Sequence, residues 1–489
     1  MFIGGKLSAL IVLVLLAAFL RLYQIDRYMQ FQGDEGRDAL VLWKLVVEKK
    51  LTLIGPGTSV GHMYNGPLYY YLILPSFVLA GLSPVGPSVF VALIGVATVL
   101  MIYLIGREWF SPMAGSTAAI LYALSPTVII YSRSSWNPNV MPFFALLAIY
   151  AIWRVFNGGK FRWLLICFIS LAFAIQAHYL GLLLLPTILV WWLLAVKKEK
   201  VDRQALLHST AISFIVFILL MSPIVLFDIR HQFLNSRAML TFFSQRQTTV
   251  NFKVYKAVPN LLPILERMTT SLLTAGSKHL GTITSSVILF GTIVLFIRRY
   301  KVTSLRLLVT WVSFGIIGLG LYKQSLFDHY YGFIFPAIFL IAGALIDYLW
   351  ETAKVTRVAV IVAFMGLLYL NLSASPLLAT PYDLYQHAQV ISREIVQSSG
   401  GKDFNLGMIA NQNYDESYRF ILRKWGAPLK EMPPDLTEQL FVVCELPVSQ
   451  CNPVGHPKAE IANFGWAKID SSRSFPWGVT LYKLIHNKP

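Results

Sequence analysis

The chain has 489 residues, of which 56% are hydrophobic and 13% are charged, and its mean hydropathy is +0.60. Soluble globular domains carry roughly a quarter of charged residues, so this composition excludes an ordinary soluble protein and predicts an integral membrane protein. The net charge of +17 does not indicate a nucleic-acid-binding protein, because the basic residues lie in short clusters between apolar runs.

About eleven apolar runs approach the ~17 to 25 residues that cross a bilayer as a helix. The first run begins near Met1, and no small-residue cleavage site follows it before Arg21, so we expect an uncleaved first helix or signal anchor. The sequence therefore predicts an α-helical polytopic membrane protein. The runs lie at residues 7–22, 88–106, 113–131, 139–155, 163–177, 180–196, 209–227, 282–297, 306–322, 333–350 and 357–372.

Short basic connections between these runs predict the orientation. Cytoplasmic loops of membrane proteins carry an excess of lysine and arginine, so we assign these connections to the cytoplasm. The N-terminus is then cytoplasmic, and segments 21–87, 132–138, 176–179, 228–281, 323–332 and 373–489 are external, in the plasma or inner membrane. The basic connections contain Arg107; Arg154, Lys160 and Arg162; Lys197, Lys198, Lys200 and Arg203; Arg298, Arg299, Lys301 and Arg306; and Lys354 and Arg357.

One further apolar stretch, residues 67–82, is short, carries Pro75 and begins with three tyrosines. If it crossed the membrane, Arg107 and every later basic loop would change sides. We therefore interpret it as an interfacial or re-entrant helix within the first external loop, residues 21–87. Whether it spans is not decided by the sequence.

The polar tail differs from the rest of the chain. Strand-like FNLGMIA, LFVVCEL and GVTLYKLI alternate with helix-like YDESYRFILRKWG, which predicts a small external α/β domain over residues 376–489. Cys444 and Cys451 lie close together there and can form a disulfide outside the cytoplasm, although two free thiols fit equally well. The loop 228–281 mixes aromatic, basic and apolar residues and is expected to fold onto the membrane surface.

The most informative segment is FQGDEGRDALVLWKLVVEKK, in which Asp34 and Glu35 follow Gly33 and begin an amphipathic helix. Two adjacent carboxylates close to the hydrophobic layer suit a general base and a neighbour that orients it. The alternative is simple capping, because acidic residues are common at helix starts. A glycine-rich loop and an aromatic segment, GPGTSVGHMYNGPLYYYL, follow, so the first external loop is long and structured.

Other polar residues are expected at the same external level. YSRSSWNPNV places Arg133, Asn137 and Asn139 at one turn, and further turns carry His178, Lys323 and His329. Arg133 suits a lipid phosphate, but an arginine at a helix end also often extends to the interface. A single histidine is more often structural than a ligand. Several such groups at one membrane level favour a shared external cavity.

Two other classes of function remain. No nucleotide phosphate loop, HExxH helix or GxSxG motif occurs, so the sequence indicates neither a nucleotide-driven pump, a zinc protease nor a serine hydrolase. A lipid or solute transporter or flippase is the main alternative, although few charges fall at mid-span, where transporters keep them. The second alternative is a scaffold protein that presents the C-terminal domain.

Several motifs in order resemble the GT-C membrane glycosyltransferases, in the branch of the protein O-mannosyltransferases and lipid A aminoarabinose transferases. They are GDEGRD in the first loop, GPLYYYL, the cytoplasmic turn LIGREWF, and LSPTVIIYSRSSWNPN in the second external loop. HYYGFIFPAIFLIAG near the end is similar to the late-helix pattern of that family. The match covers about the first third of the chain, and the middle agrees in hydropathy alone.

This resemblance implies a GT-C domain over residues 1–375, an external α/β domain over 376–489, and a polyprenyl-phosphate sugar as donor. Asp34 matches the catalytic position, with Glu35 as its partner, and transfer to an acceptor hydroxyl inverts the sugar. Candidates for the donor phosphate or substrate are Arg133, Asn137, His178, Lys323 and His329. No cofactor or divalent ion is expected. The sugar, the acceptor (protein, lipid or glycan) and the oligomeric state are left open.

Overall fold

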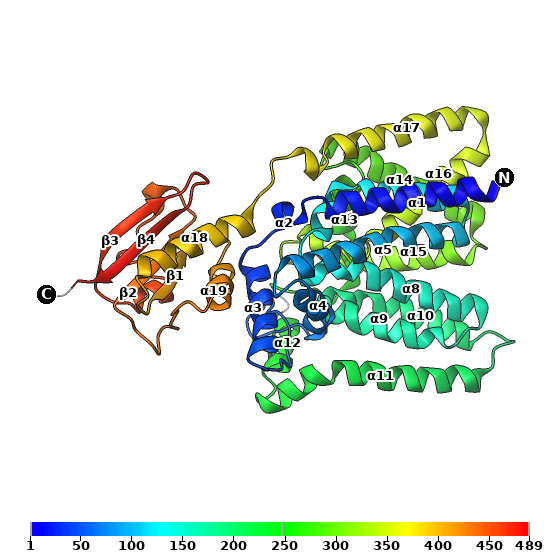
Figure 1. Ribbon diagram of the computed structural model, residues 1–489. Coiled ribbons are helices and arrows are strands. Elements are labelled where there is room, and N and C mark those ends of the chain that lie inside the picture. The colour runs from blue at the N-terminus through cyan, green and yellow to red at the C-terminus, as the bar shows by residue number, and fades with distance from the viewer. Residues whose placement is uncertain (1, 246–247, 488–489) are drawn as a thin grey trace.

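The computed structural model describes residues 2–245 and 248–487, with side chains from Ser8 onward. The ends of the two predicted domains, Met1 and residues 488–489, lie outside the described residues, as do 246–247 in the loop 228–281. The described part is mostly helical, with one small sheet near the C-terminus (Figure 1). The predicted fold class, a polytopic helical membrane protein with a C-terminal α/β part, is confirmed.

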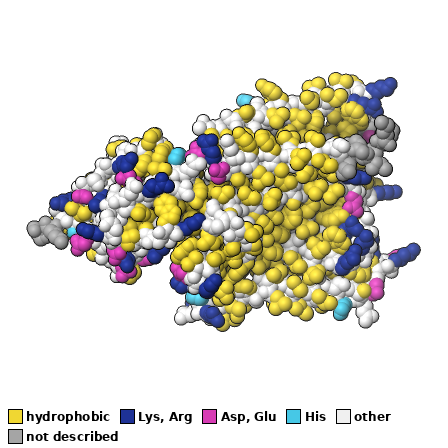
Figure 2. Space-filling view, in the orientation of Figure 1, with side chains coloured by type: hydrophobic (Ala, Val, Ile, Leu, Met, Phe, Trp, Pro, Cys, Tyr) yellow, Lys and Arg dark blue, Asp and Glu magenta, His cyan; other side chains and the backbone are white. Residues whose placement is uncertain are grey.

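The helices of the N-terminal part form one bundle in which most run in alternating directions (Figure 1). Hydrophobic side chains cover most of the face of the bundle that Figure 2 shows. The helices are α1 (Phe2–Leu22), α2 (Ile25–Tyr28), α3 (Gly33–Val47), α4 (Leu68–Leu79), α5 (Val85–Trp109), α6 (Pro112–Leu124), α7 (Pro126–Ser132), α8 (Met141–Gly158), α9 (Trp163–Ala177), α10 (Leu184–Val196), α11 (Arg203–Arg230), α12 (Leu234–Ser244), α13 (Val258–Leu272), α14 (Lys278–Arg299), α15 (Thr303–Gly320), α16 (Phe335–Thr352) and α17 (Lys354–Ser373).

Each of the eleven predicted runs is helical, and the run 113–131 is divided between α6 and α7. Among the described residues, eight helical stretches are long and apolar enough to cross a membrane, and α6 with α7 makes a ninth if the pair is one span. That pair bends by 65°. Pro126 begins α7 and disfavours a helical conformation at the residue before it, which accounts for the break. The remaining two predicted spans are α1, whose apolar part is described from Ser8, and the 15-residue α9.

Helix α4 has 12 residues, which at about 1.5 Å per residue is too short to cross a bilayer. It lies with α2, α3 and α12 at the end of the bundle that carries the C-terminal part (Figure 1). The interpretation of residues 67–82 as a helix that does not span is therefore supported by its length and its place.

The C-terminal part is a four-stranded sheet with helices against it. The strand order is β1-β2-β4-β3, with β1 and β2 parallel and the other two pairs antiparallel. Cys444, at the end of β2, forms a disulfide with Cys451. The elements are α18 (Leu384–Ser399), β1 (Asn405–Ile409), α19 (Glu416–Lys424), β2 (Gln439–Cys444), α20 (Ala459–Ala462), β3 (Ala467–Ser474) and β4 (Thr480–His486).

This C-terminal part docks onto the first loop. Arg27 pairs with Asp383 at 2.9 Å, and the Lys424 Nζ donates to the Leu82 carbonyl at 2.8 Å. Helix α19 packs directly across α3. The domain boundary at 375/376 stays a prediction, and α17 ends two residues before it.

Candidate active site

Helix α3 begins with the acidic motif, and hydrogen bonds fix its first turn. The backbone N–H of Gln32 donates to Glu35 Oε2 at 3.1 Å, so Glu35 serves as the reciprocal acceptor at the helix start. Glu35 is 6% exposed, and burial raises its pKa to about 7. The capping role that the sequence allowed for the acidic pair is therefore filled by Glu35.

Asp34 points away from this cap and remains accessible, with 39% of its side chain exposed. Its Oδ1 accepts hydrogen bonds from Arg37 at 2.8 Å and from the Tyr414 hydroxyl. Burial raises the pKa of the Tyr414 phenol, so the hydroxyl stays protonated and donates. Both bonds fall on Oδ1, and within the described part of the chain Oδ2 accepts no hydrogen bond.

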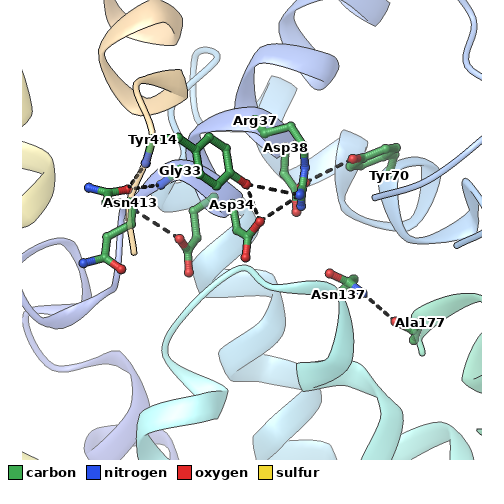
Figure 3. A network of polar contacts seen from close by, with 11 residues as sticks. Gly33, Asp34, Arg37, Asp38, Tyr70, Asn137, Ala177, Asn413 and Tyr414 are labelled. Carbon is green, nitrogen blue, oxygen red and sulfur yellow. Dashed lines mark hydrogen bonds and ion pairs between the residues drawn. The ribbon is translucent and has the colours of Figure 1, made fainter. Parts of the chain in front are cut away.

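Arg37 joins Asp34 to a second carboxylate, as Figure 3 shows. Its guanidinium also donates to Asp38 Oδ1, at 2.7 and 3.0 Å, and Tyr70 donates to the same oxygen at 3.1 Å. Asp38 is 1% exposed, and burial raises its pKa to about 6 although Arg37 opposes the shift. We call Asp34, Glu35, Arg37 and Asp38, with Tyr70 and Tyr414, the acidic network.

The two glycines of the motif are needed for close approach. A Cβ on Gly33 would lie 2.6 Å from the Tyr414 ring, and a Cβ on Gly36 would lie 2.2 Å from the Ser417 backbone nitrogen. Asn413 Oδ1 also accepts from the Gly33 N–H at 2.8 Å. The absence of side chains at Gly33 and Gly36 therefore lets residues 413–417 of the C-terminal part pack against the start of α3.

A cavity of about 780 Å³ lies between α13, the end of α15 and the segment that follows α15. Among the described residues three basic ones line it, Lys256, Arg267 and Lys323, and no acidic one does. Arg267 is half exposed and pairs with Asp328 at 3.4 Å. We call this the cationic cavity. Its charge and size suit a phosphate group with an attached sugar.

Comparisons with known proteins bear on the fold of the chain. Residues 64–227 match the family model described as dolichyl-phosphate-mannose-protein mannosyltransferase. ArnT from Cupriavidus metallidurans bound to undecaprenyl phosphate is 14% identical, with a TM-score of 0.62 over 98% of both chains. AglB, an oligosaccharyltransferase from Archaeoglobus fulgidus solved with an inhibitory peptide and a dolichol-phosphate, is 12% identical over 90% of this chain and 69% of its own, with a TM-score of 0.55. The chain has the GT-C fold of membrane glycosyltransferases.

Sequence relatives of this GT-C chain match a shorter region. Two Bacillus subtilis (strain 168) proteins with the names "Putative mannosyltransferase YkcB" and "Putative mannosyltransferase YycA" are 29% and 28% identical over 125 and 127 residues. These alignments cover 24% and 26% of this chain but 18% of either relative. The chain therefore aligns with less than a fifth of each relative's length.

The other predicted site residues of this GT-C chain differ in what they contact. His178 and His329 lie together, with ring centroids 6.0 Å apart, and Trp136 packs on His329 at 4.4 Å. Burial lowers the pKa of His178 to about 3 and that of His329 to about 4. Both rings are thus neutral near pH 7 and bring no positive charge to a phosphate. Lys323 lies in the cationic cavity.

Arg133 and Asn137 are both hydrogen-bonded to the backbone. Arg133 is 2% exposed, and its guanidinium donates to the carbonyls of Leu20 and Tyr23 at 2.8 and 2.6 Å, where it caps the end of α1. Asn137 donates to the Ala177 carbonyl at 2.6 Å and lies apart from the acidic network (Figure 3). These N–H groups donate to backbone carbonyls and so have a structural role, while a contact of either residue with the donor phosphate or substrate stays a prediction.

Sequence reasoning missed several residues of the site. Arg37 and Asp38 stood in the quoted motif without a role, and their spacing from Asp34, three and four residues on one helix face, was the available signal. Lys256 and Arg267 belong to the loop 228–281, whose helix α13 packs into the bundle. Nothing in the sequence pointed to Tyr414. Among the described residues no group of three or more His, Cys, Asp or Glu is arranged to hold a metal ion.

Proposed function

We propose that this chain is a glycosyltransferase that moves a sugar from a polyprenyl-phosphate donor to an acceptor hydroxyl, at the membrane face where the C-terminal part lies. The observation that carries the proposal is the accessible Asp34 carboxylate, fixed by Arg37 and Tyr414 at that end of a GT-C bundle. The mannosyltransferase family model and the polyprenyl phosphates bound by ArnT and AglB support the donor class.

In the proposed reaction Asp34 acts as general base. The acceptor oxygen attacks the anomeric carbon and forms the new C–O bond, while the bond from that carbon to the phosphate oxygen breaks. Asp34 Oδ2 takes the hydroxyl proton, and the electron pair leaves with the polyprenyl phosphate. A single displacement inverts the sugar. Glu35 keeps the helix start rigid, so it acts as a positioning residue.

The cationic cavity is the proposed place for the leaving phosphate. Arg267 and Lys323 offer charge-assisted hydrogen bonds to phosphate oxygens, and Lys256 adds positive charge. The neutral His178 and His329 remain proposed as hydrogen-bond donors to the sugar. No described residue requires a divalent ion in this scheme, and metal independence stays part of the proposal.

The proposed orientation places the N-terminus in the cytoplasm and residues 376–489 outside. Lysine and arginine gather at the bundle end opposite the C-terminal part (Figure 2), which agrees with the positive-inside rule. The Cys444–Cys451 disulfide suits an oxidising compartment. The division into a membrane domain, 1–375, and an external domain, 376–489, belongs to the same proposal.

No observation favours the transporter alternative. Within the described spans the carboxylates are Glu108, Asp228, Asp347 and Glu351, and all lie within about two turns of a helix end. Transporters instead keep ionisable groups near the midplane.

The decisive test compares the wild type with Asp34→Asn in lipid nanodiscs. Each is given a panel of polyprenyl-phosphate sugars with cell-envelope acceptors, and release of polyprenyl phosphate is measured. Loss of a general base lowers the rate by about 10² to 10⁴, while Asn keeps the Oδ1 acceptor for Arg37 and Tyr414. Equal turnover by the two proteins, or none by the folded wild type with any donor, contradicts the proposal.

A further inference from the structure

A second cavity, of about 320 Å³, lies between the C-terminal part and the residues that lead into α3. The first-loop side supplies Phe31 and Gln32, and the opposite side supplies residues from α18, the segment before α19 and the turn before β4. We call it the aromatic cavity. It is separate from the cationic cavity, with which it shares no lining residue.

The aromatic cavity adjoins the acidic network through a short chain of contacts. Gln32 lines it and stands two residues before Asp34. Asn413, another lining residue, accepts from the Gly33 N–H, and its neighbour Tyr414 donates to Asp34. A molecule bound in this cavity thus rests against the same segment that holds the proposed base.

Flat aromatic rings form one wall. His387 stacks on Trp477 with centroids 4.1 Å apart and planes 6° apart, and Phe475 stacks behind Trp477 at 5.1 Å. Tyr382 adds a ring that is 44% exposed. Stacked rings are rigid and present an electron-rich face, which attracts the weakly positive C–H groups of a pyranose ring.

Polar groups face this wall. Glu445 accepts from Asn413 at 3.0 and 3.1 Å and from Tyr418 at 3.2 Å. A carboxylate has about four acceptor positions, and these bonds take three, so Glu445 retains capacity for about one hydroxyl of a ligand. Gln32 is exposed and offers both a donor and an acceptor. A few polar groups beside an aromatic wall are the usual composition of a specific small-ligand site.

The charge of the cavity excludes a phosphate. Its described lining contains one carboxylate, Glu445, and no lysine or arginine. An extended peptide is also disfavoured, because peptides commonly bind by adding a strand to a sheet edge. The edge strands of this sheet are β1 and β3, and neither contributes a described lining residue.

We infer that the aromatic cavity is an acceptor subsite that binds one or two neutral sugar units of a glycan. This inference rests on the proposed function and selects a glycan from the acceptor classes left open. The bound sugars hold the acceptor chain beside α3, and a hydroxyl of the next unit meets Asp34.

The test measures binding without donor, so that it is independent of turnover. Full-length protein in nanodiscs is titrated with soluble disaccharides and trisaccharides of neutral hexoses and N-acetylhexosamines, and with serine-containing peptides, by ligand-observed NMR and calorimetry. The variants are Trp477→Ala, Tyr382→Ala and, as a matched control, Trp466→Ala, because Trp466 is 86% exposed on the same domain outside the cavity. Tyr382→Ala is the variant less able to disturb folding, since Tyr382 is already 44% exposed.

We expect at least one saccharide to bind the wild type and Asp34→Asn equally, with affinity at least tenfold lower in Trp477→Ala and Tyr382→Ala and unchanged in Trp466→Ala. Absence of saccharide binding, binding that both cavity variants retain, or peptide binding that they abolish overturns the inference. Saccharide binding with this pattern but no donor turnover refutes the proposed function and leaves the sugar site standing.

Discussion

The acidic network and the cationic cavity lie at the same end of the bundle but are built differently. Asp38 and Glu35 are nearly inaccessible, and the network is fixed by short hydrogen bonds and close glycine contacts. Lys256, Arg267 and Lys323 stand exposed around about 780 Å³ of open space. A general base needs a fixed geometry, whereas a lipid-linked phosphate has to enter and leave. The difference indicates that catalysis and donor binding respond to different substitutions.

Arg267→Ala is expected to have the largest effect on donor binding. Loss of a hydrogen bond from a charged group costs about 1.5–3 kcal/mol, so the donor KM rises roughly 10- to 100-fold with kcat little changed. Steady-state kinetics with varied donor concentration measures both constants. Arg162→Ala, an exposed arginine at the opposite end of the bundle, is the matched control and leaves both constants unchanged. A fall in kcat alone would place Arg267 with the acidic network instead.

Glu35→Gln tests how strongly burial acts on the network. The pKa of Glu35 is raised from 4.5 to about 7, so the folded state prefers the protonated form and loses stability as pH rises between these values. The loss reaches roughly 3 kcal/mol above pH 7. Gln is neutral and keeps the acceptor for the Gln32 N–H. The melting temperature of the variant, relative to that of the wild type, therefore increases as the pH rises from 4.5 to 8. Glu199→Gln, at an exposed turn, shows no such gain.

Gly36→Ala tests the close approach of the C-terminal part. The new Cβ meets the Ser417 backbone, which cannot move as a side chain can, and overpacking of this kind costs about 1–3 kcal/mol. We expect a lower melting temperature, faster proteolysis of the C-terminal part and reduced turnover. Gly366→Ala in α17, where no atom lies within 4 Å of the added Cβ, is the control and keeps wild-type values. Equal behaviour of the two variants would argue against tight docking.

Tyr414→Phe should give the smallest change. It removes one of two hydrogen bonds to Asp34 and leaves the ring against Gly33. At about 1 kcal/mol for one such bond, kcat falls about fivefold while the donor KM stays constant. That pattern is the reverse of the one expected for Arg267→Ala. A raised donor KM in Tyr414→Phe would remove the distinction between the two regions.

Much of the fold was predictable because lipid imposes a strong signal on sequence. Each apolar run became a helix, since every backbone polar group in the bilayer has to be bonded within its own segment. Strand β3 was missed because AKIDSSRS lies on an exposed edge and has no alternating apolar residues. Strand β2, which lies between β1 and β4 inside the sheet, is buried along its whole length and was predicted.

The site was predictable where its residues are close in sequence. GDEGRD places three carboxylates and an arginine within two helical turns, and the sequence singled out Asp34 and Glu35 there as a predicted general base and its neighbour. Arg133 shows the limit, because a sequence does not reveal whether an arginine at a helix end faces a cavity or a neighbouring carbonyl. Tyr414 is 380 residues from Asp34, and a contact at that separation leaves no local pattern.

That separation has a consequence for biosynthesis. The ribosome makes the Asp34 carboxylate 380 residues before the Tyr414 hydroxyl that holds it. A nascent chain in which every membrane helix has formed still lacks the 413–417 contact until the C-terminal part has been made and folded. The order of synthesis itself thus keeps the acidic network unfinished in every partly made molecule.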